Sequence, residues 1–193
     1  MMNTLLNFTI FASASLATLY LYGSDRSEEV TKDKEIEITA ANKSDARIQL
    51  SKLLITITAP LSIIFESPYL LQLHRSQIVS TLGIVMVVIA FYVFRQAKIE
   101  LGKSYSPCFN SRVANDLIQT GIYGYIRHPI YSLNFIMILG YFLISGSAWV
   151  LIALLNLFYL YFETISLEEK ALAKYLNGYE DYMKRTGRFF LKL

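Results

Sequence analysis

Long apolar runs separated by short charged stretches are the feature of this sequence that most restricts its fold. The 20 residues from Asn3 to Tyr22 carry no charged side chain. About 20 mainly apolar residues are enough for one helix to cross the roughly 30 Å of hydrocarbon in a bilayer. Hydrophobic residues make up 54% of the chain, which is high for a soluble domain of 193 residues. The sequence therefore predicts an integral membrane protein.

The expected fold class is all-α, a polytopic membrane helical bundle with about five transmembrane helices and a C-terminal amphipathic helix. The expected spans are residues 3–22, 50–73, 78–94, 129–144 and 148–165. Residues 166–186 form the expected amphipathic helix, because Leu, Ala and Tyr recur there at helical spacing. Pro60 interrupts the second span, whereas Pro129 opens the fourth, because proline suits the first turn of a helix.

Two polar segments divide the chain. Residues 23–49 form a polar loop after the first span, and residues 96–128 form a longer loop before the fourth span. We therefore expect an N-terminal region of membrane helices, residues 1–95, and a C-terminal region, residues 96–193, that carries the candidate site.

The distribution of basic residues predicts the orientation in the membrane. If the five spans start from an external N-terminus, 17 of the 18 Lys and Arg residues lie on one side, and Arg75 lies on the other. Basic residues are concentrated in cytoplasmic loops, so the candidate site is expected to face the cytoplasm. Because the charges lie in short stretches between apolar runs, the expected partners are membrane lipids and not nucleic acids.

The candidate site combines a helix start with two adjacent acids. The helix that begins at Pro129 points its free N–H groups toward the cytoplasm, where Arg127 and His128 add cationic donors, and together these groups are suited to a carboxylate or phosphate. Glu168 and Glu169 project about 100° apart on a helix of 3.6 residues per turn, so only one of them can face a pocket squarely. An alternative is that these charges only mark a membrane boundary and the start of the tail helix.

Several other kinds of site are not expected. The chain has two histidines and one cysteine, with no Cys/His cluster, so no metal site is predicted. It also lacks a Walker lysine loop, a GxSxG elbow and a GxGxxG fingerprint.

One combination of motifs resembles a known family. Residues 121–131 read GxYxxxRHPxY, Glu168 and Glu169 follow a helical hairpin, and residues 182–190 form a basic, aromatic tail. Together these features resemble the isoprenylcysteine carboxyl methyltransferase (ICMT) family of integral membrane methyltransferases. The similarity extends from about Leu101 to the C-terminus, and the combination is far more specific than the RHP tripeptide alone.

The resemblance implies a methyltransferase that uses S-adenosyl-L-methionine, with residues 96–193 as its cofactor-binding and catalytic region. The cofactor-binding residues that it implies are Asn115, Leu117 (through its backbone), Tyr123, Arg127, His128, Pro129, Tyr131, Glu168 and Glu169. Of these, the implied catalytic residues are Arg127, Glu168 and Glu169. A lipid-facing opening would admit a lipophilic methyl acceptor.

Two positions depart from the family pattern and leave the acceptor open. Asn115 stands where the family often has histidine, and Glu163 stands where it often has an arginine suited to a substrate carboxylate. The first expectation is carboxyl O-methylation of an isoprenylcysteine-like substrate, and the close alternatives are a phospholipid amine or a thiol. Two further alternatives are an NADPH-dependent membrane reductase of the steroid-reductase type and a non-catalytic membrane protein.

Overall fold

The computed structural model describes residues 12, 41–65, 73, 76–102 and 116–192. Its elements are α2 (Ala41–Ile64), α3 (Gln77–Leu101), the 3-10 helix η3 (Gly121–Gly124), α4 (Pro129–Ser145), α5 (Ala148–Tyr175) and α6 (Tyr179–Arg185). The described residues contain no β-strand, and Ile126 and Gly187 form an isolated bridge. The all-α prediction is therefore confirmed.

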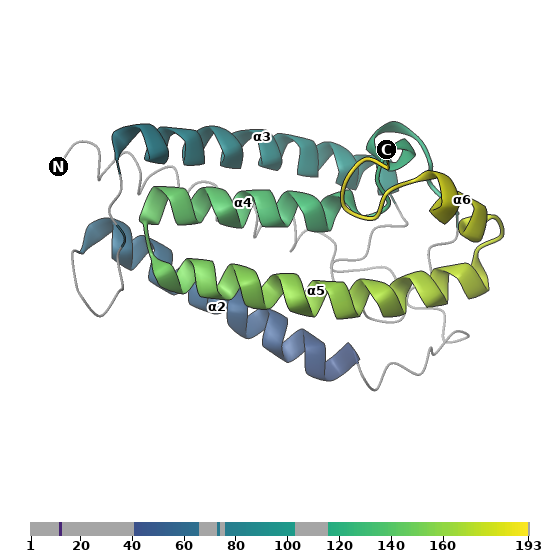
Figure 1. The fold of residues 1–193 in the computed structure, drawn as a ribbon, viewed down its shortest axis with the longest axis horizontal. Helices are drawn as coiled ribbons and strands as arrows, with labels where there is room; N and C mark the ends of the chain where they lie inside the picture. Colours follow the sequence, from purple (N-terminus) through teal and green to yellow (C-terminus); the bar gives the residue numbers. More distant parts are fainter. Residues whose placement is uncertain (1–11, 13–40, 66–72, 74–75, 103–115, 193) are drawn as a thin grey trace.

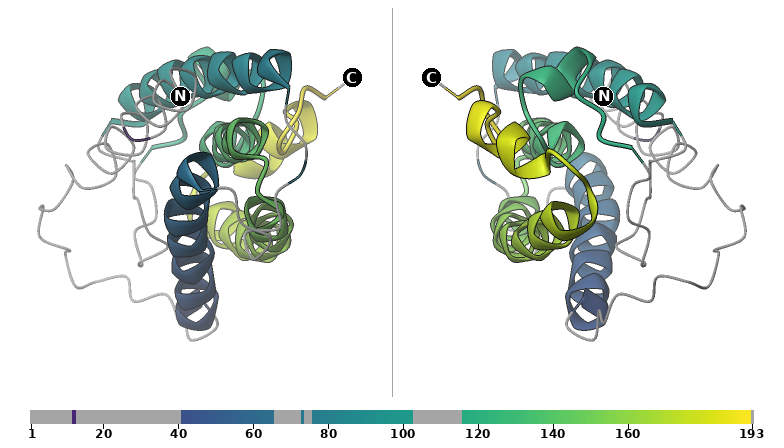
Figure 2. Two further views of the ribbon diagram at one scale, coloured as in Figure 1. Left: turned by 90° about the vertical axis from the view of Figure 1, so that its left-hand side faces the viewer. Right: turned by 90° about the vertical axis from the view of Figure 1, so that its right-hand side faces the viewer.

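The four long helices alternate in direction, and α4 lies beside both α3 and α5 (Figure 1). A short turn at Gly146 and Ser147 joins α4 to α5, and Gly146 adopts a left-handed conformation with φ 66°. Helix α3 packs on α4, and α2 crosses α5, as the end views show (Figure 2). The short helix α6 lies at the end of the bundle where α4 begins and α5 ends (Figure 1). This arrangement brings residues 116–128, the end of α5 and the C-terminal tail to the same end.

Helices α3 and α4 approach each other closely where two glycines meet. A Cβ atom added to Gly83 would lie 2.7 Å from the carbonyl oxygen of Gly140, and one added to Gly140 would lie 2.8 Å from that of Gly83. Small residues that let helix backbones touch are typical of helix packing in membranes, where apolar burial alone does not drive association. The contact fixes α4, and with it the start of α4 at the candidate site.

The outward faces of the helices are apolar. Large apolar side chains such as Ile78, Val88 and Leu155 are more than half exposed. By length and hydropathy, α3 and α5 qualify as membrane spans, whereas α4 and the apolar part of α2 are shorter. Of the expected first span, residues 3–22, the structure describes only Ala12, so five spans stay a prediction.

The start of α2 and the end of α3 differ from those expected. Helix α2 begins at Ala41, inside the expected polar loop, and continues through Pro60 without a break. Helix α3 continues past the expected end at residue 94 to Leu101, because residues 95–101 contain neither glycine nor proline and Gly102 follows with φ 50°.

The segment expected as a separate amphipathic helix at residues 166–186 is instead part of two helices. Helix α5 continues without a break to Tyr175, because residues 166–175 are mostly strong helix formers. The chain then turns at Gly178, which has φ 82°, and continues as α6. The end of α5 therefore carries Glu168 and Glu169 on a rigid helix that is continuous with the bundle.

Candidate functional site

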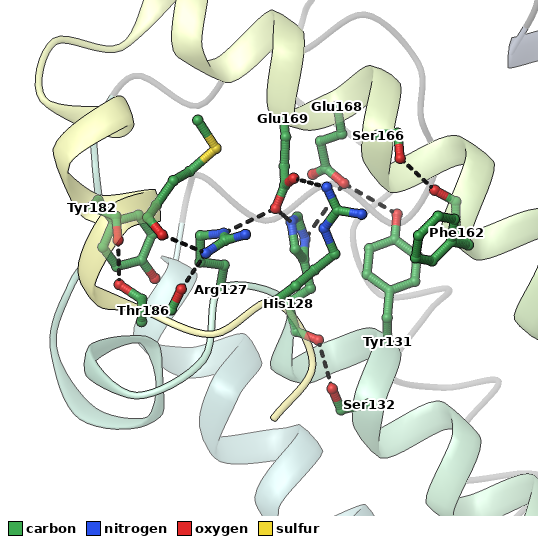
Figure 3. A network of polar contacts seen from close by, with 12 residues as sticks. Arg127, His128, Tyr131, Ser132, Phe162, Ser166, Glu168, Glu169, Tyr182 and Thr186 are labelled. Carbon is green, nitrogen blue, oxygen red and sulfur yellow. Dashed lines mark hydrogen bonds and ion pairs between the residues drawn. The ribbon is translucent and has the colours of Figure 1, made fainter. Parts of the chain in front are cut away.

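The candidate site lies at the end of the bundle where three segments meet (Figure 3). Arg127 and His128 come from the loop just before α4, and Tyr131 comes from the first turn of α4. Glu168 and Glu169 come from α5, and Arg188 comes from the tail after α6. We refer to these six residues as the polar cluster.

Glu169 is the centre of the polar cluster. Its Oε1 atom accepts a hydrogen bond from Arg127 Nε at 2.9 Å and lies 3.2 Å from His128 Nε2. Its Oε2 atom forms an ion pair with Arg188. The Glu169 side chain is only 6% exposed, and its contacts with the guanidinium groups of Arg127 and Arg188 compensate for the removal of its charge from water. Both oxygens of this acid are therefore occupied in holding the three segments together.

Glu168 is placed differently, although it is the neighbouring residue. Its side chain is 30% exposed, and its Oε2 atom accepts a hydrogen bond from the Tyr131 hydroxyl at 3.4 Å. The same atom lies 3.7 Å from His128 Nδ1. Among the described residues, no hydrogen bond reaches its other oxygen. One acid thus points into the protein and the other reaches its rim, as their separation on a helix predicts.

The C-terminal tail is fastened to the loop before α4 by backbone hydrogen bonds. Arg127 N donates to the Gly187 carbonyl at 2.8 Å, and His128 N donates to the Arg188 carbonyl at 3.1 Å. The Ser132 hydroxyl donates to the Phe189 carbonyl at 3.0 Å. We call residues 126–132, Glu169 and residues 182–189 together the C-terminal clamp.

Arg127 and Tyr182 complete the clamp from opposite directions. Arg127 Nη1 donates to the Met183 carbonyl at 3.0 Å and also to the Thr186 carbonyl. The Tyr182 hydroxyl donates to the Tyr123 carbonyl at 2.6 Å. Burial raises the pKa of Tyr182 to about 12, although the nearby Arg127 acts to lower it. The phenol is therefore protonated at neutral pH and can donate this bond.

The predicted site residues outside the polar cluster are Pro129, Tyr123, Leu117 and Asn115. Pro129 is buried and opens α4, as the sequence predicts. The Tyr123 ring is buried in an apolar cluster with residues of α3 and α4, including Phe94 and Leu133. The Leu117 side chain lies next to Gly178, at the turn between α5 and α6. Asn115 lies outside the described residues. The polar cluster thus unites five predicted residues, whereas the Tyr123 ring belongs to the core.

Two contacts of this site, those of Arg188 and Glu100, could not be predicted from local sequence patterns. Arg188 was part of the basic, aromatic tail, but its pairing with Glu169 depends on the closure of the tail and not on a local pattern. Glu100 at the end of α3 accepts a hydrogen bond from Ile122 N at 3.1 Å. Its carboxylate fills the space where a Cβ on Gly121 would lie, and Gly121 has φ 52°. Gly121 in the GxY motif is the signal for this contact, because a side chain there would displace Glu100.

Next to the polar cluster lies an open groove of about 510 Å³. It is lined by Arg127, Phe162, Met183, Thr186, Gly187, Arg188, Phe189, Phe190, Leu191 and Lys192. We call it the tail groove. Its volume is within the range of about 300–1,000 Å³ that is usual for small-molecule sites. Among the described residues, no three His, Cys, Asp or Glu side chains are grouped so that they could hold a metal ion.

The fold and the site define an all-helical protein with apolar helices and a polar, interlocked end. Residues 76–178, slightly more than half of the chain, match the model of the PEMT family, described as phospholipid methyltransferase. The chain belongs to the phospholipid methyltransferase family. The matched segment contains the GxYxxxRHPxY motif and both acids. The match supports the predicted class of protein at the level of this family, whereas the methyl transfer, its cofactor and its acceptor stay predictions.

The chain is also similar to a protein named nickel-cobalt-cadmium resistance protein NccN from Alcaligenes xylosoxydans xylosoxydans. The two are 34% identical over 86 residues, a match that covers 44% of this chain and 40% of that protein. The similarity therefore concerns less than half of either chain.

Proposed function

We propose that this protein is a multi-pass membrane methyltransferase that takes the methyl group from S-adenosyl-L-methionine and transfers it to a lipophilic acceptor at the cytoplasmic face. The observation that carries this proposal is the contrast between the two acids of the polar cluster. Glu168 is partly exposed, whereas both carboxylate oxygens of the neighbouring Glu169 already contact protein side chains. Both acids and the loop before α4 lie inside the segment that matches the methyltransferase family.

The residues present fit the amino-acid end of the cofactor. That end carries an ammonium and a carboxylate. Glu168 offers a carboxylate, with an oxygen that no described residue engages, to the ammonium. The positive end of the α4 dipole, at His128, would attract the carboxylate. Tyr131, in the first turn of α4, donates a hydrogen bond to Glu168.

In this proposal the rest of the polar cluster acts by positioning. Bound S-adenosyl-L-methionine supplies a methyl group on a sulfonium, which an amine or carboxylate acceptor takes up directly. Alignment and exclusion of water are then the main tasks of the protein. Arg127 and His128 hold Glu169, and Glu169 holds the tail through Arg188. These contacts orient Glu168 and close the site.

A phospholipid amine is the first acceptor that we propose, because the matched family is described as phospholipid methyltransferase. An ammonium group must lose a proton before it can accept a methyl group, so this acceptor requires a base in addition to the cofactor site. An isoprenylcysteine-like carboxylate is the second candidate, supported by the motif in residues 121–131. Glu163 disfavours the carboxylate acceptor, because it is an acid at the position where the family often has an arginine. Glu163 accepts a hydrogen bond from the Tyr159 hydroxyl at 2.7 Å.

Calorimetric titration of the full chain in detergent tests the proposal. We expect S-adenosyl-L-methionine to bind the unaltered protein. Glu168→Gln should weaken binding by about tenfold or more, because a charge-assisted hydrogen bond contributes roughly 1.5–3 kcal/mol. Glu163→Gln, on the same helix but outside the polar cluster, is the matched control and should change the affinity by less than about twofold.

Three outcomes would contradict the proposal. Equal affinity for the cofactor in Glu168→Gln and the unaltered protein would remove Glu168 from the site. Selective binding of NADPH would favour the reductase alternative. Binding of neither compound by folded protein would favour a non-catalytic membrane protein.

A further inference from the structure

Glu100 is an acid at the end of a helix that is unfavourable for acids. Helix α3 ends at Leu101, and the partial negative charge of a helix C-terminus favours cations, such as Lys98 in the same turn. The Glu100 carboxylate instead accepts a hydrogen bond from the Ile122 N–H at 3.1 Å. The stability of α3 does not account for this acid, so its contact with Ile122 is the feature that indicates its role.

The space beside Gly121 is filled by the Glu100 carboxylate. A Cβ atom at Gly121 would lie 2.0 Å from Oε1 of Glu100 and 2.3 Å from Oε2. At the start of η3, the Thr120 side chain forms no capping hydrogen bond. The carboxylate therefore takes the role that a local capping side chain plays in other helices. Because it comes from another helix, it ties the start of η3 to α3.

Ile122 connects this contact to the polar cluster. Its N–H is held by Glu100, and its carbonyl accepts hydrogen bonds from the N–H groups of residues 125 and 126, both at 3.1 Å. Arg127 follows directly and donates its own N–H to the Gly187 carbonyl at 2.8 Å. The Glu100 contact and the polar cluster are therefore joined by a short segment of hydrogen-bonded backbone.

Apolar packing also holds this segment, but in a different way. Ile122 and Tyr123 belong to an apolar cluster with Phe94 and Ala97 of α3. Apolar contacts are non-directional, whereas a hydrogen bond requires one donor at a defined distance and angle. The apolar cluster therefore keeps η3 against α3, and the Glu100 carboxylate sets the orientation of its backbone.

We propose that Glu100 is a positioning residue of the cofactor site, because its carboxylate holds the Ile122 N–H and so sets the backbone position of the loop before α4. Arg127 of this loop holds Glu169, and Glu169 in this position leaves the neighbouring Glu168 at the rim. The inference rests on the proposed function, in which Glu168 binds the ammonium of the cofactor. Glu100 touches no ligand itself and acts through the loop.

Titration of S-adenosyl-L-methionine into the full, detergent-purified chain tests the role of Glu100. Glu100→Ala should weaken binding about tenfold, because the apparent Kd rises as fewer molecules hold the loop in its binding position. Helix α3 should be no less stable, since alanine is a better helix former and an acid is unfavourable there. Glu100→Gln should restore most of the affinity, because its amide oxygen can accept the same hydrogen bond. Glu180→Ala, at an exposed acid of α6, is the matched control and should change the affinity by less than about twofold.

Gly121→Ala tests whether the contact itself carries the effect. The added Cβ atom would displace the carboxylate, so this substitution should weaken cofactor binding about tenfold while Glu100 is present. In the Glu100→Ala background the space is free, and the same substitution should weaken binding by less than about threefold. Residue 121 has φ 52° in the native backbone, so an effect of backbone strain alone would be equal in both backgrounds.

Hydrogen exchange in the absence of cofactor measures the same link without binding or activity. In Glu100→Ala, exchange should increase at the amide of Ile122 and also at those of Arg127 and His128, whereas amides inside α5 should not change. An increase confined to Ile122 would show that the contact is only local and would overturn the inference.

Two results of the titrations would also overturn the inference. These are unchanged affinity in Glu100→Ala and an equal effect of Gly121→Ala in both backgrounds. Failure of the proposed function gives a different pattern: the unaltered protein would not bind S-adenosyl-L-methionine, but in Glu100→Ala exchange would still spread from Ile122 to Arg127. That pattern would reject the cofactor and support Glu100 as the residue that positions the loop. Neither cofactor binding nor spread of exchange would reject both.

Discussion

The contact between α3 and α4 and the C-terminal clamp hold the protein together by opposite means. Between α3 and α4, Gly83 and Gly140 let two backbones touch, and the contact depends on the absence of side chains. In the clamp, Glu169 holds Arg127, His128 and Arg188 by charge and hydrogen bonds. An added side-chain atom would therefore destabilise the contact between α3 and α4, whereas loss of a charged group would destabilise the clamp. The comparison indicates that the bundle provides a rigid base and that the clamp builds the site on it.

Removal of the Glu169 carboxylate should have the largest effect on stability. Glu169→Ala leaves Arg127 without its buried partner, and loss of one member of a buried ion pair typically costs about 3–5 kcal/mol. Hydrogen exchange should increase first at the amides of Arg127 and His128, which hold the tail. Glu163→Ala is the control and should change little. Uniform exchange across the whole chain in Glu169→Ala would show that the clamp is not a separate unit.

Addition of a side chain at the contact between α3 and α4 should have the second-largest effect on stability. Gly140→Ala places a Cβ atom 2.6 Å from Val87 Cγ2 and 2.8 Å from the Gly83 carbonyl oxygen. Such overpacking costs about 1–3 kcal/mol, and the better helix propensity of alanine offsets up to about 1 kcal/mol of this. Unfolding in dodecyl sulfate, followed by circular dichroism, measures the change. The neighbouring Leu139→Ala, at an exposed position of α4, is the control. A more stable Gly140→Ala protein would mean that the helices are not in contact there.

Loss of the Tyr182 hydroxyl should have a smaller effect, about 1 kcal/mol, because it removes one hydrogen bond, to the Tyr123 carbonyl. The raised pKa of this hydroxyl also predicts that the stability of the protein depends on pH. The pKa of Tyr182 is raised by burial from 10.0 to about 12, so its contribution is complete below pH 10 and is lost as the pH rises through 12. In Tyr182→Phe, the free energy of unfolding should fall less steeply with pH above pH 10. Because burial also raises the pKa of Tyr179, part of this dependence on pH should stay. An unchanged slope would contradict the role of the hydroxyl.

Glu168→Gln should have the smallest effect on stability, below about 0.5 kcal/mol, because the side chain is partly exposed and the amide can still accept the Tyr131 hydrogen bond. This variant separates the roles of the two adjacent acids, because Glu169 is a buried part of the clamp, whereas Glu168 is partly exposed. A loss of stability as large as that of Glu169→Ala would show that both acids serve the fold.

The sequence predicted those parts of the structure that depend on local chemistry. Pro129 marks the start of α4, because its ring suits a first helical turn. The continuation of α5 past residue 165 was missed, because charged residues there resemble a membrane boundary although they are good helix formers. The clamp could not be predicted in detail, because Arg127 bonds the carbonyl of Thr186, 59 residues away along the chain. The pairing of Glu169 with Arg188 likewise depends on a tail that closes over the end of the bundle.

The central claim is that the polar end of this bundle transfers a methyl group from S-adenosyl-L-methionine. Its most direct test is the transfer of radiolabelled methyl to lipid in proteoliposomes that contain phosphatidylethanolamine or a prenylcysteine. Label should enter the lipid fraction with the unaltered protein and with Lys174→Gln, a change at an exposed position of α5, and it should fall by about tenfold or more with Glu168→Gln. Equal transfer by Glu168→Gln, or no transfer to either lipid by the folded protein, would contradict the account.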